Sequence, residues 1–218
     1  MTTGSHRFGI GIPENWTEYD LHGDTLAERR AEMLRHAPRK ETRDAVNQAF
    51  RSARRIMDGA RRRGAVYAAG TTTMYEDGLL MAGLMIFSVS PPAGADFSAR
   101  GLAREFSAAG GHRREGTSRT LTTQTLPGVG PVGRMAGIEE TEIADGVSSR
   151  LVVTHTFVPV PGGERVLVIT CFSPNIPLAE PLYDLFDAIT STFAFGDAEP
   201  KAQAEAQAEA EAVVEGGA

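Results

Sequence analysis

The sequence predicts a single α+β domain built on a largely antiparallel sheet, and three observations predict it. The chain has 218 residues, enough for one sizeable domain. Its apolar residues recur at helical spacing in some segments and form strand-like runs in most of the others. Two of these runs flank Asp145-Gly146, a strong signal for a two-residue hairpin and therefore for antiparallel pairing.

The predicted elements follow one another with short connections. In chain order they are a strand at 8–12, helices at 25–37 and 41–63, strands at 65–69 and 79–89, a helix at 96–108, strands at 119–126, 133–143, 147–158 and 165–172, and a helix at 178–189. Turn residues separate most of them, including Pro161-Gly162-Gly163. We therefore expect one compact unit over residues 7–196.

The helices are predicted from caps and from apolar stripes. Thr25 and Glu28 fit a capping box at the start of the first helix. Asp96 is expected to cap the third helix. The apolar sides are predicted as Val46, Ala49, Phe50, Ala53, Ile56, Met57 and Ala60 in the second helix, Phe97, Leu102 and Phe106 in the third, and Leu178, Leu182, Leu185, Phe186 and Ile189 in the last.

The strands differ in how much of their surface is apolar. Residues 79–89 and 165–172 are apolar on both faces, which is typical of strands in the middle of a sheet with cover on each side. Residues 119–126 are rich in threonine and polar enough for an edge strand. The opening strand ends at Pro13, with Trp16 just beyond it.

The two ends of the chain are predicted to lie outside the domain. Residues 1–6 are expected to be flexible. Residues 197–218 repeat alanine with glutamate or glutamine and have no apolar face, so we expect a disordered acidic tail. From residue 199 onward the tail holds five glutamates and one lysine, a net charge of −4.

Composition limits the classes of function and the location. The whole chain carries a net charge of −6, so the body without the tail is close to neutral, and no general nucleic-acid binding is expected. The N-terminus shows no secretory signal, and no apolar run is long enough to insert into a membrane. The single cysteine fits a reducing compartment. The sequence therefore predicts a cytoplasmic protein.

No sequence motif identifies a cofactor site, a metal site or a catalytic nucleophile, because the residues around each candidate do not fit that function. Gly128, Gly130 and Gly133 match a dinucleotide-binding pattern, but a strand rather than a helix is expected after them, so we interpret the segment as a turn. The five histidines lack ligand spacing, and Cys171 sits in an apolar run that should raise its pKa. The carboxylates Glu139, Glu140 and Glu142 are interpreted as a solvated surface. No cofactor and no metal site is predicted.

His155 is the one histidine with a specific expectation. By alternation it shares a strand face with Leu151, Val153 and Phe157, which should place it inward. The main interpretation is a hydrogen-bonded histidine with a structural role. A catalytic base at the same position is the alternative.

The second helix carries the main charge feature. Residues 39–63 hold nine basic side chains and three acidic ones, a net charge of +6. At 100° per residue, Arg51, Arg55 and Arg62 fall opposite the apolar stripe. The alternatives are an ordinary solvated helix face and a docking surface for an acidic partner, for which the chain's own tail is also a candidate.

The order of elements resembles that of PsbP/Mog1-like domains of an uncharacterised actinobacterial type. The resemblance rests on the opening strand with Ile12-Pro13 and Trp16, the central hairpins and the closing segment 185–193, and it covers about residues 7–196. Shorter points of similarity are 158–163 and 173–175. It implies an α/β/α sandwich, with helices on both faces of the sheet. It also implies binding to other proteins without shared catalytic residues.

These observations favour a non-catalytic protein-binding or accessory module over an enzyme. The candidate binding residues are Arg51, Arg55 and Arg62, and the partner is expected to be a protein. The alternative is a small-molecule-binding protein or an enzyme with a polar site near His155, Arg134 and Asn175. The two functions differ in what they need: an enzyme needs polar side chains converging in a pocket, whereas an adaptor needs only an exposed surface.

Overall fold

The computed structural model describes residues 7–21, 24–35, 39–75, 78–91, 94, 96–109, 118–144, 147–162 and 165–196. The segments predicted to be a flexible N-terminus (1–6) and a disordered tail (197–218) lie outside these residues. The elements are β1 (Phe8–Gly9), β2 (Thr17–Glu18), α1 (Asp24–Arg35), α2 (Lys40–Arg62), β3 (Ala65–Tyr75), β4 (Gly78–Val89), α3 (Ala99–Ala109), β5 (Ser118–Leu126), β6 (Gly130–Ala144), β7 (Val147–Pro159), β8 (Val166–Ser173), the 3₁₀ helix η1 (Ile176–Leu178), α4 (Ala179–Ser191) and β9 (Ala194–Phe195).

A seven-stranded sheet forms the body, in the order β2-β3-β4-β8-β7-β6-β5. Every pair in it is antiparallel. The predicted hairpin is confirmed by the pairing of Ala144 with Val147, while residues 145–146 themselves lie outside the described part. The two strands predicted to be central, β4 and β8, pair with each other in the middle of the sheet. The predicted α+β class with a largely antiparallel sheet is confirmed.

One face of the sheet packs on α4. Leu182, Phe186 and Ile189 of this helix are buried in a cluster with β4, β7 and β8, and Phe186 is fully buried. Alternate residues of β7, from Val152 to Val158, point to this side and are also buried. The first and last described strands, β1 and β9, pair with each other beside the same cluster, and Phe8 of β1 stacks on Phe193, just before β9. This closed face holds the main core.

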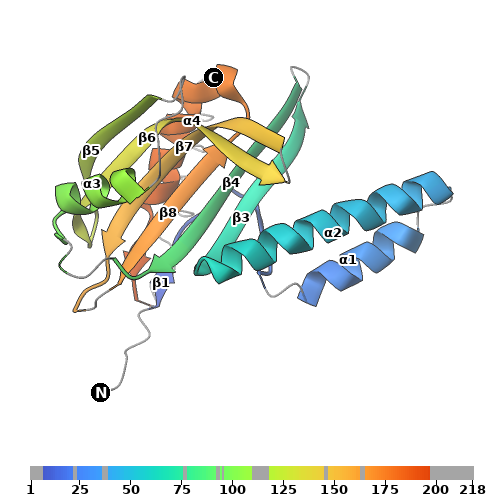
Figure 1. Cartoon of the computed structure of the whole chain (residues 1–218), viewed down its shortest axis with the longest axis horizontal. Coiled ribbons are helices and arrows are strands. Elements are labelled where there is room, and N and C mark those ends of the chain that lie inside the picture. The colour runs from blue at the N-terminus through green and yellow to red at the C-terminus, as the bar shows by residue number, and fades with distance from the viewer. Residues whose placement is uncertain are drawn as a thin grey trace, which may run out of the picture.

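The opposite face packs on α3 over only part of its area. Leu102 and Ala103 of α3 contact Met135, Phe157 and residues of β8. Figure 1 shows α3 in front of the sheet, over β5 and β6, and α4 behind it. The helices therefore touch both sides, but the prediction of a sheet covered by helices on both faces is not confirmed, because Leu79, Met81 and Leu121 stay exposed on the α3 side.

The remaining helices form a hairpin at one side of the sheet. Figure 1 shows α1 and α2 lying beside each other and extending away from the strands. Arg30 of α1 donates a hydrogen bond to Asn47 of α2 at 2.9 Å. The C-terminal end of α2 joins the body at Gly64, whose carbonyl accepts a hydrogen bond from the backbone N–H of Ser88. Gly64 has φ of 89°, and an added Cβ would meet Ser88, so the tight exit requires glycine.

Several predicted boundaries differ from the structure. Helix α3 begins at Ala99, because Ser98 accepts the amide N–H of Gly101 while Asp96 in turn holds Ser98. Phe97, predicted on the apolar side of this helix, is therefore exposed before its first turn. Leu178, predicted in the last helix, is exposed in η1 instead. Strand β3 runs to residue 75 rather than 69, because β4 pairs along its whole length.

Candidate functional site

The three residues of the predicted polar site do not come together. Arg134 pairs with Thr156 across the β6–β7 ladder, and His155 pairs with Met135. Neighbouring positions of a strand point to opposite faces, so the two side chains lie on opposite sides of the sheet. Asn175 follows the end of β8. A single site built from His155, Arg134 and Asn175 is therefore wrong.

Arg134 and Asn175 have structural contacts. An Nη of Arg134 lies 2.6 Å from a carboxylate oxygen of Asp187, which ties β6 to α4. The amide of Asn175 accepts the backbone N–H of Met81 at 2.9 Å and donates to the carbonyl oxygen of Leu79 at 2.8 Å. It thereby replaces a strand where β8 has ended, which satisfies backbone groups of β4 that would otherwise lack a partner.

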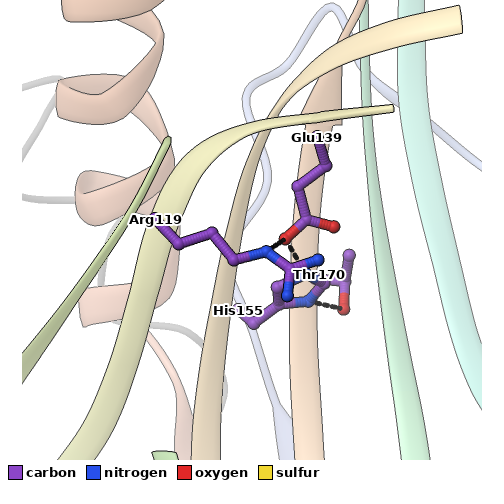
Figure 2. Close-up of polar contacts among 4 residues, drawn as sticks. All are labelled: Arg119, Glu139, His155 and Thr170. Carbon is purple, nitrogen blue, oxygen red and sulfur yellow. Dashed lines mark hydrogen bonds and ion pairs between the residues drawn. The ribbon is translucent and has the colours of Figure 1, made fainter. Parts of the chain in front are cut away.

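His155 belongs to a different group of polar side chains, on the α3 side of the sheet. Its Nδ1 lies 2.9 Å from the hydroxyl of Thr170, and its Nε2 lies 3.5 Å from a carboxylate oxygen of Glu139. The same oxygen lies 2.9 Å from Nε of Arg119. Figure 2 shows these four side chains, one from each of β5, β6, β7 and β8, converging above the strands. We call Arg119, Glu139, His155 and Thr170 the sheet-face network.

The network is half-buried, and this environment acts on the pKa of Glu139. The side chains of Arg119, Glu139 and His155 are 19%, 14% and 20% exposed. Burial disfavours the carboxylate, but the hydrogen bond and charge of His155, followed by the charge of Arg119, outweigh burial and lower the pKa of Glu139. The prediction that Glu139 lies on a solvated surface is therefore wrong.

The position of His155 agrees with its predicted face. The ring lies on the same side of β7 as Val153 and Phe157, and it stacks on Phe157 with ring centroids 6.4 Å apart. It is only partly inward: Met135, its partner in the same row on β6, is 4% exposed and packs against α3, whereas the side chain of His155 is 20% exposed. Leu121, in the same row on β5, is 43% exposed.

The order hydroxyl, imidazole, carboxylate in this network is the order that activates a nucleophile in acyl transfer. Thr170 lies in β8, which pairs on both sides with β7 and β4. Backbone amides of these strands are used in the ladders. Among the described residues, no pair of free amide donors therefore faces the hydroxyl to stabilise an oxyanion. The network can position protons and hold a polar group.

The predicted arginine face lies on the helical hairpin, far from the network. Arg51 and Arg62 are exposed, as predicted, whereas the side chain of Arg55 lies outside the described part. Asp58, Arg61 and Arg62 line a shallow hollow near the end of α2. Within the described residues, no carboxylate forms an ion pair with Arg51 or Arg62.

The remaining sequence signals have structural explanations. Gly128 and Gly130, with φ of 71° and 102°, form the tight connection between β5 and β6, and Gly133 lies against the backbone of Ala99. This confirms the turn interpretation.

Cys171 is fully buried, and burial raises the pKa of its thiol to about 12. No group of three metal-ligating side chains occurs in the part of the chain that the structure describes.

The helices give no sign of a membrane span: none of those described combines the length and the apolar composition that crossing a bilayer requires. The predicted cytoplasmic location stays a prediction.

Comparisons with known proteins leave the family open. No family model matches this chain. No curated protein matches it. The crystal structure of LpqN, described as involved in cell envelope biogenesis of Mycobacterium tuberculosis, has a TM-score of 0.44 and 12% sequence identity, with 89% of this chain and 86% of that chain covered. This similarity is too low to support an argument. The resemblance to PsbP/Mog1-like domains is not confirmed.

Proposed function

We propose that this chain is a non-catalytic protein-binding module, and that the arginine face of α2, defined as Arg51, Arg55 and Arg62, binds an acidic protein partner. One observation carries the proposal. The α1–α2 hairpin extends away from the sheet (Figure 1) and exposes Arg51 and Arg62 without a described acidic neighbour in ion-pair contact. Exposed charges of one sign attract an oppositely charged surface and speed its association.

The packing of the hairpin supports a role in binding. Val46 and Ala60 are buried while Arg51 and Arg62 are exposed, so α2 has an apolar side that packs and a basic side that does not. The contact of α2 with the sheet lies near its C-terminal end, at Gly64 and the start of β3. A helical hairpin anchored at one end leaves most of its length free for a partner.

We also propose that the chain is a PsbP/Mog1-like domain with an α/β/α sandwich fold. The resemblance implies members that act by binding other proteins. The fold alone names no partner, so the proposed partner is defined by chemistry, as a protein with an acidic surface.

The test compares two charge-reversal variants that change net charge equally. Arg51→Glu/Arg62→Glu alters the arginine face, and Arg100→Glu/Arg104→Glu alters two exposed arginines of α3. The probe is a fluorescent polyglutamate peptide, with binding measured by anisotropy at low and high salt. We expect the first variant to bind at least about tenfold more weakly, the second to bind like wild type, and salt to weaken wild-type binding because exposed charges are screened. Equal affinity of both variants for the peptide would show that the arginine face is not the binding surface.

A second candidate function, a small-molecule or catalytic site, rests on the sheet-face network. The line from Thr170 through His155 to Glu139 favours proton transfer to a bound polar group. Hydrolysis of a nitrophenyl ester is the test. Catalysis by the wild type that His155→Gln and Thr170→Val both abolish, with the fold intact, would favour this function over the first.

A further inference from the structure

The two edges of the seven-stranded sheet are unequal. At the β3 edge, Thr17 and Glu18 of β2 pair with Gly70 and Ala69, and the register shifts between residues 65 and 67. At the other edge, β5 makes nine consecutive pairs with β6 without a shift. No described strand pairs with the outer side of β5, which Figure 1 shows at the margin of the sheet. One edge is short and irregular, and the other is long and regular.

Proteins block an exposed edge with lysines, prolines, bulges and charges that point inward, and β5 has only the last of these, in a single residue that is neutralised by its own chain. Residues 118–126 contain no lysine, no proline and one charged residue, Arg119, whose guanidinium is turned to Glu139 of its own chain. Thr122 and Thr123 are exposed, and so is Leu121. Threonine and leucine on a regular edge favour addition of another strand.

We propose that β5 pairs with β5 of a second copy of this chain. The two strands run antiparallel about a two-fold axis at Thr122, which joins two seven-stranded sheets into one continuous sheet. The occupant is a second copy because the strand is complementary to itself. In this register Leu121 faces Thr123 of the partner subunit, and Arg119 faces Thr125 of the partner subunit, so no like charges meet.

The pairing also covers apolar surface. Leu121 is 43% exposed in the single chain. Across the proposed axis the two copies of Leu121 are diagonal neighbours on one face of the sheet, roughly 7–8 Å apart, within reach of one another's side chains. The strand pairing satisfies outward-pointing backbone groups, and the leucine contact fixes the register.

This dimer is independent of the proposed function. The sheet order places β5 at one edge, whereas α2 leads into β3 near the other. Pairing through β5 therefore leaves the arginine face of each copy uncovered, and a variant of one surface should not alter the other. Failure of the dimer and failure of acidic-partner binding are separate results.

The first experiment measures mass by light scattering and sedimentation over a concentration series. Leu121→Lys/Thr123→Lys places lysines opposite each other across the axis, where like charges repel. The matched control, Val66→Lys/Thr72→Lys, places the same kind of charges on exposed positions of β3. We expect the wild type and the control to be dimers, and the β5 variant to dimerise at least about tenfold more weakly because of the facing charges. A monomeric wild type, or dissociation by the control alone, would overturn the proposal.

The second experiment identifies the contact directly. Cys171 is buried, so Thr122→Cys introduces one accessible thiol, placed on the proposed axis. Facing residues of an antiparallel pair are close enough for a disulfide after small adjustments. Mild oxidation should link two copies of this variant, and Thr72→Cys should stay unlinked. Linkage through Thr72→Cys but not Thr122→Cys would contradict pairing through β5.

Discussion

The two faces of strand β7 show how differently this protein treats polar groups. On the α4 side, Thr154 and Thr156 are 2% and 1% exposed, and Arg134, which pairs with Thr156 across the ladder, is 12% exposed and forms an ion pair with Asp187 of α4. On the α3 side, His155 takes part in a network with Glu139 and is 20% exposed. On both faces a half-buried charged side chain has a counter-charge, because burial makes an unpaired charge costly. On the closed face the covering helix supplies it through Asp187, whereas on the α3 side neighbouring strands bring Arg119, Glu139 and His155 together. The difference teaches that the strands of this sheet can build a polar network among themselves.

The largest effect expected from this comparison concerns the closed face. Phe186→Ala removes a fully buried ring of α4 and should lower the free energy of unfolding by about 3–5 kcal/mol. Leu79→Ala, in β4 on the half-open face, should change it by about 0.5 kcal/mol or less, because the side chain is exposed. Urea midpoints at equal slope measure both. Equal costs at the two positions would mean that the faces do not differ in packing.

A smaller effect is expected at Glu139. Glu139→Gln removes the charge that faces Arg119 and His155 and should cost about 1–3 kcal/mol at neutral pH. The pKa of Glu139 is lowered from 4.5 in the folded protein, so its stabilisation is complete above pH 4.5 and is lost as pH falls through the lower, folded-state pKa.

The variant should therefore lose part of the acid sensitivity of the wild type. Thermal midpoints between neutral and acidic pH measure this, with Glu105→Gln as control, since Glu105 is an exposed residue of α3. If Glu139→Gln and wild type lose stability in parallel as the pH falls, the network does not stabilise the fold through this charge.

Within the network, a smaller effect than that of Glu139 is expected at His155. His155→Gln keeps a group that can hydrogen bond to Thr170, so the free energy of unfolding should fall by about 1 kcal/mol or less, or roughly 2–4 °C in the thermal midpoint. Any protein-binding activity should persist. A loss as large as that of Phe186→Ala would place His155 in the core rather than on the half-open face.

The fold was more predictable from sequence than the site. Periodicity predicts the helix with Phe186 and the paired central strands, because burial on one or both faces leaves a pattern in consecutive residues. It also places His155 on the correct side of β7. The extent of the cover by α3 could not be predicted, because no local pattern records how far a helix reaches over a sheet.

The network was missed because it depends on contacts across strands. Arg119 pairs with Gly137 on β6, and its side chain reaches Glu139, two positions further along that strand. The run of carboxylates around Glu139 indicates a solvated group, and only the pairing of strands shows that Glu139 lies beside Arg119. Residue type alone suggests a site in which Arg134 and Asn175 join His155. Their true neighbours, Asp187 and the start of β4, are set by packing between elements distant in sequence.

The burial of the single thiol has a kinetic consequence. Cys171 lies fully enclosed in the core between the sheet and α4, so a thiol reagent reaches it only when this core opens. At low reagent concentration its modification rate therefore measures how often the core opens, and at high concentration the rate of opening itself. The native cysteine thus reports on opening of the closed face without any substitution.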